Sequence, residues 1–271
     1  MTSPPARGAK FPLRLDEVGS APNSSRAVLR PQRLLAHAHR DATRRIAPAG
    51  LGLDSDDVRM RMVQRLRGIG VVNEQVLEAM ATVQRHRFVD SALITQAYED
   101  TSLPIGHGQT ISKPSVVARM IELLFGGANA RRGGHLGRAL EIGTGCGYQA
   151  AVLSAVSQHV VSVERLRPLH DKARELLAQM RPAHLRLVYG DGMLGHPPNA
   201  PYDSIIAAAG GDVLPPAWLE QLAVGGRLVS PLRKAGTQQQ VLVVVDRTEQ
   251  GCEHTVFEAV NFVPLRSGLG T

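Results

Sequence analysis

The chain has 271 residues, 43% of them hydrophobic, which is enough to bury one substantial core. Its formal net charge of +7 comes mostly from residues 1–50, which carry nine Lys and Arg against three Asp and Glu, while residues 51–271 carry 22 against 21. A nearly neutral body gives no electrostatic footprint for a nucleic-acid backbone, and two distant cysteines without a metal-ligand pattern argue against a disulfide-rich scaffold or a zinc site.

Residues 1–53 are rich in Pro, Ala, Ser and Arg and show little apolar periodicity, which is typical of a disordered basic extension. An organelle transit peptide has a similar composition, but the acidic pair Asp16 and Glu17 and several prolines weaken that interpretation. No apolar run approaches the ~18 residues of a membrane span, and no heptad seam indicates assembly. We therefore expect a monomeric, cytoplasmic protein with neither a membrane nor a nucleic-acid partner.

From residue 54 the pattern becomes periodic, and we expect one folded domain over 54–271. The stretches "DSDDVRMRMVQRLRGIG" (54–70) and "NEQVLEAMATV" (73–83) place apolar side chains three or four residues apart, so they predict two helices. In "TSLPIGHGQTISKPSVVARMIELL" (101–124), Pro104, Gly106 and Gly108 interrupt regular structure, and helical spacing resumes after Pro114. Residues 54–137 are thus expected to form a helical prelude that includes a structured loop.

From residue 138 short Val, Ile and Leu runs alternate with amphipathic segments. "RALEIG", "HVVSVE", "HLRLVYG" and "YDSIIAAAG" read as buried strands, each followed by a helical or turn segment. This alternation predicts an α/β fold with a doubly wound, mostly parallel seven-stranded sheet over 138–271. The last stretch, "HTVFEAVNFVPL", alternates as an antiparallel edge strand does.

Three alternating glycines mark the turn in "ALEIGTGCGYQAAVLS", residues 139–154. Gly143, Gly145 and Gly147 allow a ligand to approach the backbone closely, and the following helix presents free N–H groups. A dinucleotide fingerprint would need its third glycine at Tyr148, so this spacing disfavours pyrophosphate. Glu164 ends the next strand, about 20 residues after the loop, where a carboxylate accepts hydrogen bonds from ribose hydroxyls.

Asp191, in "YGDGM", follows the third strand of the series, where a carboxylate and adjacent backbone can meet an adenine edge. Taken alone, Glu164 would be better interpreted as an ordinary solvated carboxylate and Asp191 as an ordinary turn residue. Together with the glycine loop they favour S-adenosylmethionine, which has a ribose and an adenine but no phosphate. Trp218 reads as a helix packing residue and Cys146 as an inert thiol.

The chain resembles the protein-L-isoaspartate (D-aspartate) O-methyltransferase family over about residues 55–266. The resemblance is carried by the glycine loop and by "RHRFV", "LPIGHGQTISKPSVVARM", "VVSVER", "YGDG", "PYDSIIAAAG", "LEQLAVGGRLVSPL" and "NFVPL". It implies a class I, Rossmann-like methyltransferase fold. It also implies methyl transfer from S-adenosylmethionine to the free carboxylate of isoaspartyl residues in damaged proteins, with S-adenosylhomocysteine as the second product and no metal. This reaction is the first step of repair through a succinimide.

The resemblance also assigns site residues. It implies a catalytic Ser112 that orients the acceptor carboxylate, although helix N-capping before Pro114 is an alternative role for this side chain. Ile105, His107 and Thr110 are expected to line the substrate loop. The expected cofactor-binding residues are Glu141, Gly143, Thr144, Gly145, Gly147, Glu164, Asp191 and Gly192.

Two departures from the family pattern stand out. Gln84 stands where bacterial members usually have proline, and Gly210-Gly211 replace an "APE"-like turn, so the structure of that cofactor-side wall is open. Two alternative functions also stay open. One is methylation of RNA or a small molecule on the same fold, and the other is binding of S-adenosylmethionine without turnover.

Overall fold

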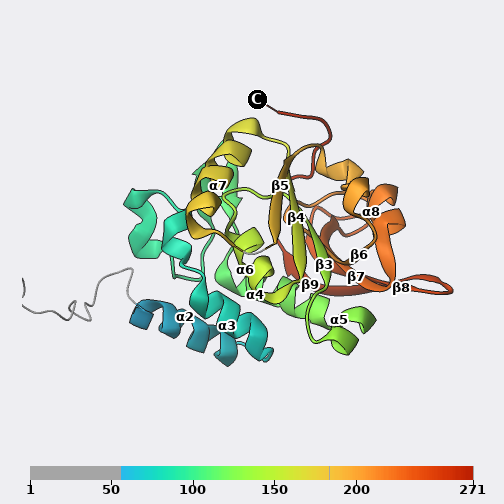
Figure 1. Ribbon diagram of the computed structural model, residues 1–271, viewed down its shortest axis with the longest axis horizontal. Helices are drawn as coiled ribbons and strands as arrows, with labels where there is room; N and C mark the ends of the chain where they lie inside the picture. Colours follow the sequence, from blue (N-terminus) through green and yellow to red (C-terminus); the bar gives the residue numbers. More distant parts are fainter. Residues whose placement is uncertain (1–55, 183, 271) are drawn as a thin grey trace, which may run out of the picture. The chain divides into compact units, whose positions relative to one another are not determined.

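The computed structural model describes residues 56–182 and 184–270 (Figure 1). The basic extension expected over residues 1–53, and the first two residues of the helix expected from residue 54, lie outside the described residues and stay predictions. No helix within the described ranges is long and apolar enough to cross a bilayer.

A seven-stranded sheet forms the centre of the domain, in the strand order β5-β4-β3-β6-β7-β8-β9. The five strands from β5 to β7 pair in parallel, whereas β8 and β9 pair antiparallel to their neighbours. The predicted mostly parallel sheet and its antiparallel C-terminal edge are therefore confirmed. The strands are β3 (Arg138–Ile142), β4 (His159–Glu164), β5 (Leu185–Tyr189), β6 (Tyr202–Ala207), β7 (Leu222–Arg233), β8 (Gln240–Thr248) and β9 (Gly251–Val260).

Each face of the sheet buries its own apolar cluster, because side chains alternate along a strand. One cluster joins Ala139, Val160 and Val229 to the helices α4 (Pro114–Phe125), α6 (Tyr148–Val156) and α7 (Arg167–Met180). The other joins Leu140 and its neighbours to α8 (Pro216–Gln221), beside the short helices η4 (Gly192–Leu194) and η5 (Pro197–Asn199). Helices thus cover both faces, as a doubly wound sheet requires.

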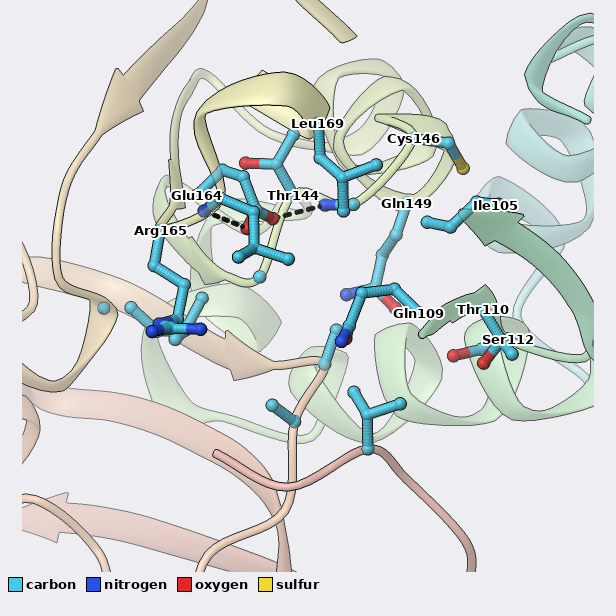
Figure 2. Close-up of a pocket in the computed structure, with 18 of the residues that line it drawn as sticks. Ile105, Gln109, Thr110, Ser112, Thr144, Cys146, Gln149, Glu164, Arg165 and Leu169 are labelled. Carbon is cyan, nitrogen blue, oxygen red and sulfur yellow. Dashed lines mark hydrogen bonds between the residues drawn. The ribbon is translucent and has the colours of Figure 1, made fainter. Parts of the chain in front are cut away.

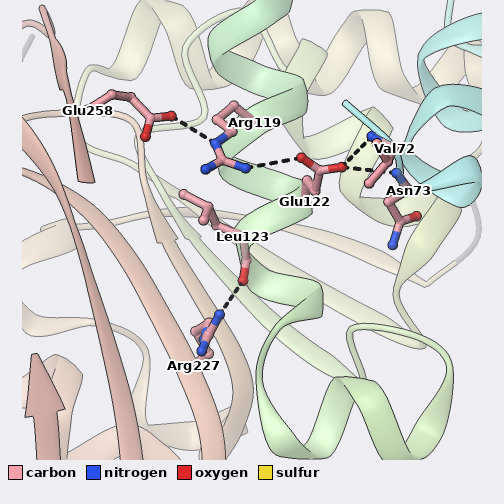
Figure 3. Close-up of polar contacts among 7 residues, drawn as sticks. All are labelled: Val72, Asn73, Arg119, Glu122, Leu123, Arg227 and Glu258. Carbon is pink, nitrogen blue, oxygen red and sulfur yellow. Dashed lines mark hydrogen bonds and ion pairs between the residues drawn. The ribbon is translucent and has the colours of Figure 1, made fainter. Parts of the chain in front are cut away.

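The expected helical prelude consists of α2 (Asp56–Gly68), α3 (Glu74–Thr82) and the 3₁₀ helices η2 (Arg85–Phe88) and η3 (Ser91–Gln96). Its apolar stripes pack into the same cluster as α4 and α6. Glu122 of α4 fixes the turn between α2 and α3, since its carboxylate accepts the N–H groups of Val72 and Asn73 (Figure 3). Arg119 pairs with both Glu122 and Glu258 of β9, so one polar chain links the prelude, α4 and the sheet edge.

Two elements differ from the sequence prediction. The stretch before α4 is a short antiparallel hairpin of β1 (Leu103–Gly106) and β2 (Gln109–Ile111), where a structured loop was expected. Its turn passes through three successive left-handed residues, at φ values of 92°, 53° and 66° for Gly106, His107 and Gly108. The short helix α5 (Ala128–Gly133) was not predicted because its sequence has no apolar stripe.

Candidate active site

A cavity lies at the carboxyl ends of the parallel strands, where the strand order reverses between β3 and β6. This is the topological switch point, at which open α/β sheets bind ligands. The cavity has about 890 Å³ of empty space, part of it open to solvent. It is lined by segments from β1 and β2, the loops after β3, β4 and β6, and residues 263–266 of the C-terminal segment (Figure 2).

The glycine loop after β3 forms one wall of this cavity. Gly143, Gly145 and Gly147 have φ values of 90°, 56° and 90°, the left-handed region that side chains with a Cβ rarely adopt. Gly143 and Gly145 line the cavity with Thr144, whereas Gly147 packs beneath it. An added Cβ on Gly147 would lie 2.8 Å from Leu177 Cδ1, so helix packing also requires this glycine.

Glu164 connects the glycine loop to the end of β4. Its Oε2 atom accepts the N–H of Gly145 at 2.8 Å, and its Oε1 atom accepts the N–H of Leu166 at 2.9 Å (Figure 2). The residue is almost fully buried yet lines the cavity, and because each carboxylate oxygen accepts one backbone N–H, each keeps a second lone pair. A carboxylate held in this way can accept the two hydroxyl protons of a ribose.

Beneath the loop, Glu141 is completely buried and does not line the cavity. The Ser162 hydroxyl donates to its Oε2 atom, and Thr144 Oγ1 lies 2.6 Å from Ser162 Oγ. Burial raises the pKa of Glu141 to about 8, so this side chain is mostly protonated at neutral pH. Glu141 therefore supports the loop from below.

Gln149 brings a polar group to the cavity that sequence reasoning missed. The residue is buried near the start of α6, and Figure 2 shows its amide end directed into the pocket. Its Nε2 atom makes no hydrogen bond of standard geometry, although the amide also interacts with the buried Glu141 carboxyl group. A buried amide donor without a hydrogen bond of standard geometry can also serve a ligand that carries a carboxylate or another acceptor.

Asp191 is already engaged by the backbone. Its Oδ1 atom accepts the N–H of Met193 at 2.9 Å, and its Oδ2 atom accepts the N–H of Gly268. Gly192 lines the cavity, but Asp191 does not. Asp191 thus fastens the loop after β5 to the C-terminal segment, and the adenine contact expected of it stays a prediction.

The C-terminal segment crosses the loops after β4 and β5. Gly270 exchanges backbone hydrogen bonds with Arg165 and Arg167, while Tyr189 donates its hydroxyl to the Gly270 carbonyl. Leu265 and Arg266, just before this crossing, line the cavity. The segment therefore forms part of the outer wall of the pocket.

Another wall of the cavity comes from the hairpin before α4 and the residue that follows it. Ile105, Thr110 and Ser112 all line the cavity, and Figure 2 shows the Thr110 and Ser112 hydroxyls together at its edge. The N-cap residue of α4 is Lys113, without a side-chain cap hydrogen bond, so Ser112 is not the N-cap. His107 is exposed at the tip of the hairpin and does not line the cavity.

Backbone pairing builds the wall at Gly210-Gly211, whose structure the sequence did not predict. Gly210 donates its N–H to Val263 O and accepts the N–H of Leu265, both at 2.8 Å. A Cβ on Gly210 would lie 2.5 Å from the Gln240 Nε2 atom, so a larger residue here would displace the Gln240 side chain from its hydrogen bonds with the Phe262 backbone. Ala208, just before this pairing, lines the cavity.

Two further side chains behave as the sequence predicted. Trp218 is fully buried in the core, where its Nε1 donates to the Gly192 carbonyl at 2.8 Å. Burial raises the pKa of the Cys146 thiol to about 11, so the thiol stays protonated at neutral pH and is a poor nucleophile. Neither is a candidate for chemistry.

The arrangement fits a nucleoside that carries a polar amino-acid tail. The Glu164 carboxylate offers paired acceptors, the Gln149 amide a polar group at the pocket wall, and the glycine loop a close backbone approach. Within the described residues, no group of three or more His, Cys, Asp and Glu side chains is placed to hold a metal ion.

Comparison with known families agrees with this geometry. The family model "Protein-L-isoaspartate(D-aspartate) O-methyltransferase (PCMT)" matches residues 57–270. The chain belongs to this family. Its class I methyltransferase fold follows from that membership and from the sheet described above. Its dependence on S-adenosylmethionine follows from the membership.

Relatives within the isoaspartyl methyltransferase family match nearly the whole chain. The protein-L-isoaspartate O-methyltransferase of Methylibium petroleiphilum is 60% identical over 261 residues, covering 96% of each chain. That of Leptothrix cholodnii is 58% identical, covering 98% of this chain and 96% of its own.

Solved structures of the family share the fold. A protein-L-isoaspartate O-methyltransferase matches with a TM-score of 0.69 and 28% identity, over 78% of this chain and 67% of its own. A putative family member from Plasmodium falciparum, solved in complex with S-adenosyl-L-homocysteine, matches with a TM-score of 0.64 and 21% identity, over 77% of this chain and 98% of its own.

Proposed function

We propose that this chain transfers the methyl group of S-adenosylmethionine to the free carboxyl group of L-isoaspartyl and D-aspartyl residues in damaged proteins. The products are a methyl ester and S-adenosylhomocysteine. One observation carries the proposal: Ser112, in the family's "QTIS" stretch, lines the same cavity as the glycine loop and Glu164. The segment that carries Ser112 (residues 103–112, the acceptor loop) and the glycine loop therefore face one space, as a transfer between two bound molecules requires.

When bound, the cofactor supplies an electrophilic methyl group on a sulfonium. A carboxylate acceptor is already ionised at neutral pH, so the protein needs no general base and His107 needs no catalytic role. Positioning supplies the catalytic power, since correct alignment of two reactants is worth roughly 7–11 kcal/mol of the barrier. We assign acceptor positioning to the Ser112 hydroxyl, assisted by Thr110 and Ile105.

We assign cofactor binding to the glycine loop and its neighbours. Gly143, Thr144, Gly145, Glu164 and Gly192 line the cavity and are proposed to contact the cofactor. Glu141, Gly147 and Asp191 do not line it, and we propose that they shape the loops that do. The catalytic domain is proposed to span residues 54–271.

The proposal also includes the oligomeric state, the binding partners and the cellular compartment of the protein. We propose a monomer without nucleic-acid or membrane partners, because residues 51–271 carry nearly balanced charge. Cys146 and Cys252 are both free, which suits the reducing cytoplasm.

RNA methylation on the same fold is the competing function. The discriminating experiment offers the protein labelled S-adenosylmethionine with either an isoaspartyl peptide or total RNA. We expect label on the peptide and none on the RNA. Label on RNA alone would show that RNA, and not an isoaspartyl protein, is the methyl acceptor. Cofactor binding with no transfer to either would indicate a protein that binds S-adenosylmethionine without turnover.

A further inference from the structure

A buried cation lies directly behind the acceptor loop. The Arg85 side chain, from the "RHRFV" stretch, is fully buried at the start of η2. Its Nε donates to the Ala97 carbonyl at 2.8 Å, and its Nη2 donates to the Ser112 carbonyl at 2.7 Å. Its guanidinium carbon lies 4.8 Å from the centre of the Tyr148 ring. One side chain thus joins the prelude, the acceptor loop and the first residue of α6.

The Arg85 charge is buried without the carboxylate that usually pairs with a buried guanidinium. None of the ion pairs among the described residues includes Arg85, and its Nη1 atom makes no hydrogen bond of standard geometry, although the guanidinium also interacts with the polar Tyr148 side chain. The nearby Asp100 instead accepts hydrogen bonds from the N–H and hydroxyl of Ser115. A buried guanidinium without a carboxylate partner costs stability, and an apolar side chain of similar size often fills such a space at no loss of stability. Packing alone therefore does not explain Arg85.

We propose that Arg85 is a positioning residue for methyl transfer. By holding the Ser112 carbonyl while stacking on Tyr148, it fixes the acceptor loop relative to the helix that follows the glycine loop. This inference rests on the proposed function, because Ser112 is its acceptor-positioning residue. A lysine cannot take the same role, since a point charge lacks the planar fork that reaches two carbonyls and stacks on a ring.

The other end of α4 provides a matched control. Arg227 of β7 donates its Nη1 to the Leu123 carbonyl at 2.9 Å, near the end of the helix (Figure 3). Its guanidinium also pairs with Asp246. Both arginines therefore hold a backbone carbonyl in or next to α4, but only Arg85 holds the end that lines the cavity. If helix anchoring were the whole role, Arg85→Lys and Arg227→Lys would affect activity alike.

The test measures kcat and KM for an isoaspartyl peptide, Kd for S-adenosylhomocysteine and Tm for the full chain and for Arg85→Lys, Arg85→Met and Arg227→Lys. The Met variant removes the buried charge and guards against misfolding of the Lys variant. Each Arg85 change is also made in a Ser112→Ala background, because residues that act as one unit give non-additive effects.

We expect both Arg85 variants to lower kcat/KM by about 10- to 100-fold, the cost of misplacing a reacting group, with Kd changed less than about threefold. The loss should be much smaller in the Ser112→Ala background, and Arg227→Lys should change kcat/KM by less than about twofold. Wild-type kcat/KM in both Arg85 variants, an equal loss in Arg227→Lys, or a full additional loss in the Ser112→Ala background would overturn the inference. A wild-type chain inactive on the peptide would instead overturn the proposed function, and this inference with it.

Discussion

Glu164 and Gly145 are joined by a hydrogen bond of 2.8 Å from the Gly145 N–H to the Glu164 carboxylate. The bond ties the acidic end of β4 to the middle of the glycine loop after β3. Because the same carboxylate also accepts the Leu166 N–H, both of its oxygens are oriented before any ligand arrives. The carboxylate proposed to bind ribose and the glycine loop are therefore one preorganised unit.

Replacing Glu164 by Gln should break this unit. The amide NH₂ would meet one of the two backbone N–H groups, and the charge that favours ribose hydroxyls would be lost. Loss of a charged hydrogen bond costs about 1.5–3 kcal/mol, so Kd for S-adenosylhomocysteine should rise about 10- to 100-fold by calorimetry. Glu175→Gln, at an exposed position on α7, is the control and should leave Kd unchanged. An unchanged Kd for Glu164→Gln would remove Glu164 from the cofactor site.

Gly145→Val should abolish measurable cofactor binding. The backbone there has φ +56°, and a Cβ would lie 3.2 Å from Ile105 Cδ1 on the cavity wall. A β-branched residue is strained in this conformation and narrows the ligand space. Gly236→Val is a matched control, since Gly236 has φ +72° with open space around it. Equal binding by the two variants, both folded by circular dichroism, would contradict the assignment of the loop.

Ser112→Ala should lower turnover while leaving cofactor affinity intact. The hydroxyl is proposed to orient the acceptor carboxylate, and losing such a bond should reduce kcat/KM about 10- to 100-fold. Ser115→Ala, one turn along the same segment, removes a hydroxyl bonded to Asp100 outside the cavity. That variant should lower Tm with little effect on kcat/KM. If Ser112→Ala keeps wild-type turnover, another group orients the acceptor.

Glu141 should make the stability of the domain depend on pH. Its pKa rises from an ordinary 4.5 to about 8 in the folded protein because it is buried. Between these values the folded state keeps a proton that the unfolded state releases, so this group's contribution to stability falls as pH rises through the window. Glu141→Gln stays neutral and should lose that slope, so it should gain in unfolding free energy relative to wild type from about pH 5 to pH 8. A difference in urea unfolding free energy that does not vary with pH would contradict the shift.

The sheet and the position of the site were predictable because their signals are local and periodic. Val- and Ile-rich runs predicted the strands. The rule that ligands bind beyond strand ends predicted that the glycine loop and Glu164 lie at one edge of the sheet. Helix faces required only apolar spacing, which also identified Trp218 as a packing residue.

Other parts of the site depend on contacts between distant segments. Arg85 lies in a run of charged residues that resembles a solvated surface, and nothing local indicates that its guanidinium is buried against Ser112. The Gly268 N–H on Asp191 joins residues 77 apart in sequence, and the C-terminal segment has no periodicity to suggest it. The motif "NFVPL" was the one available signal for Leu265 at the cavity wall. The exposed position of His107 follows from a turn of three left-handed residues, which spacing alone does not predict.

The central claim is tested most directly by transfer of radiolabelled methyl from S-adenosylmethionine to a synthetic peptide containing isoaspartate, beside the same peptide with normal aspartate. We predict label on the isoaspartyl peptide alone, released by mild base as a methyl ester is. Equal labelling of both peptides, base-stable label, or no label under conditions where S-adenosylhomocysteine binds would contradict the proposed function.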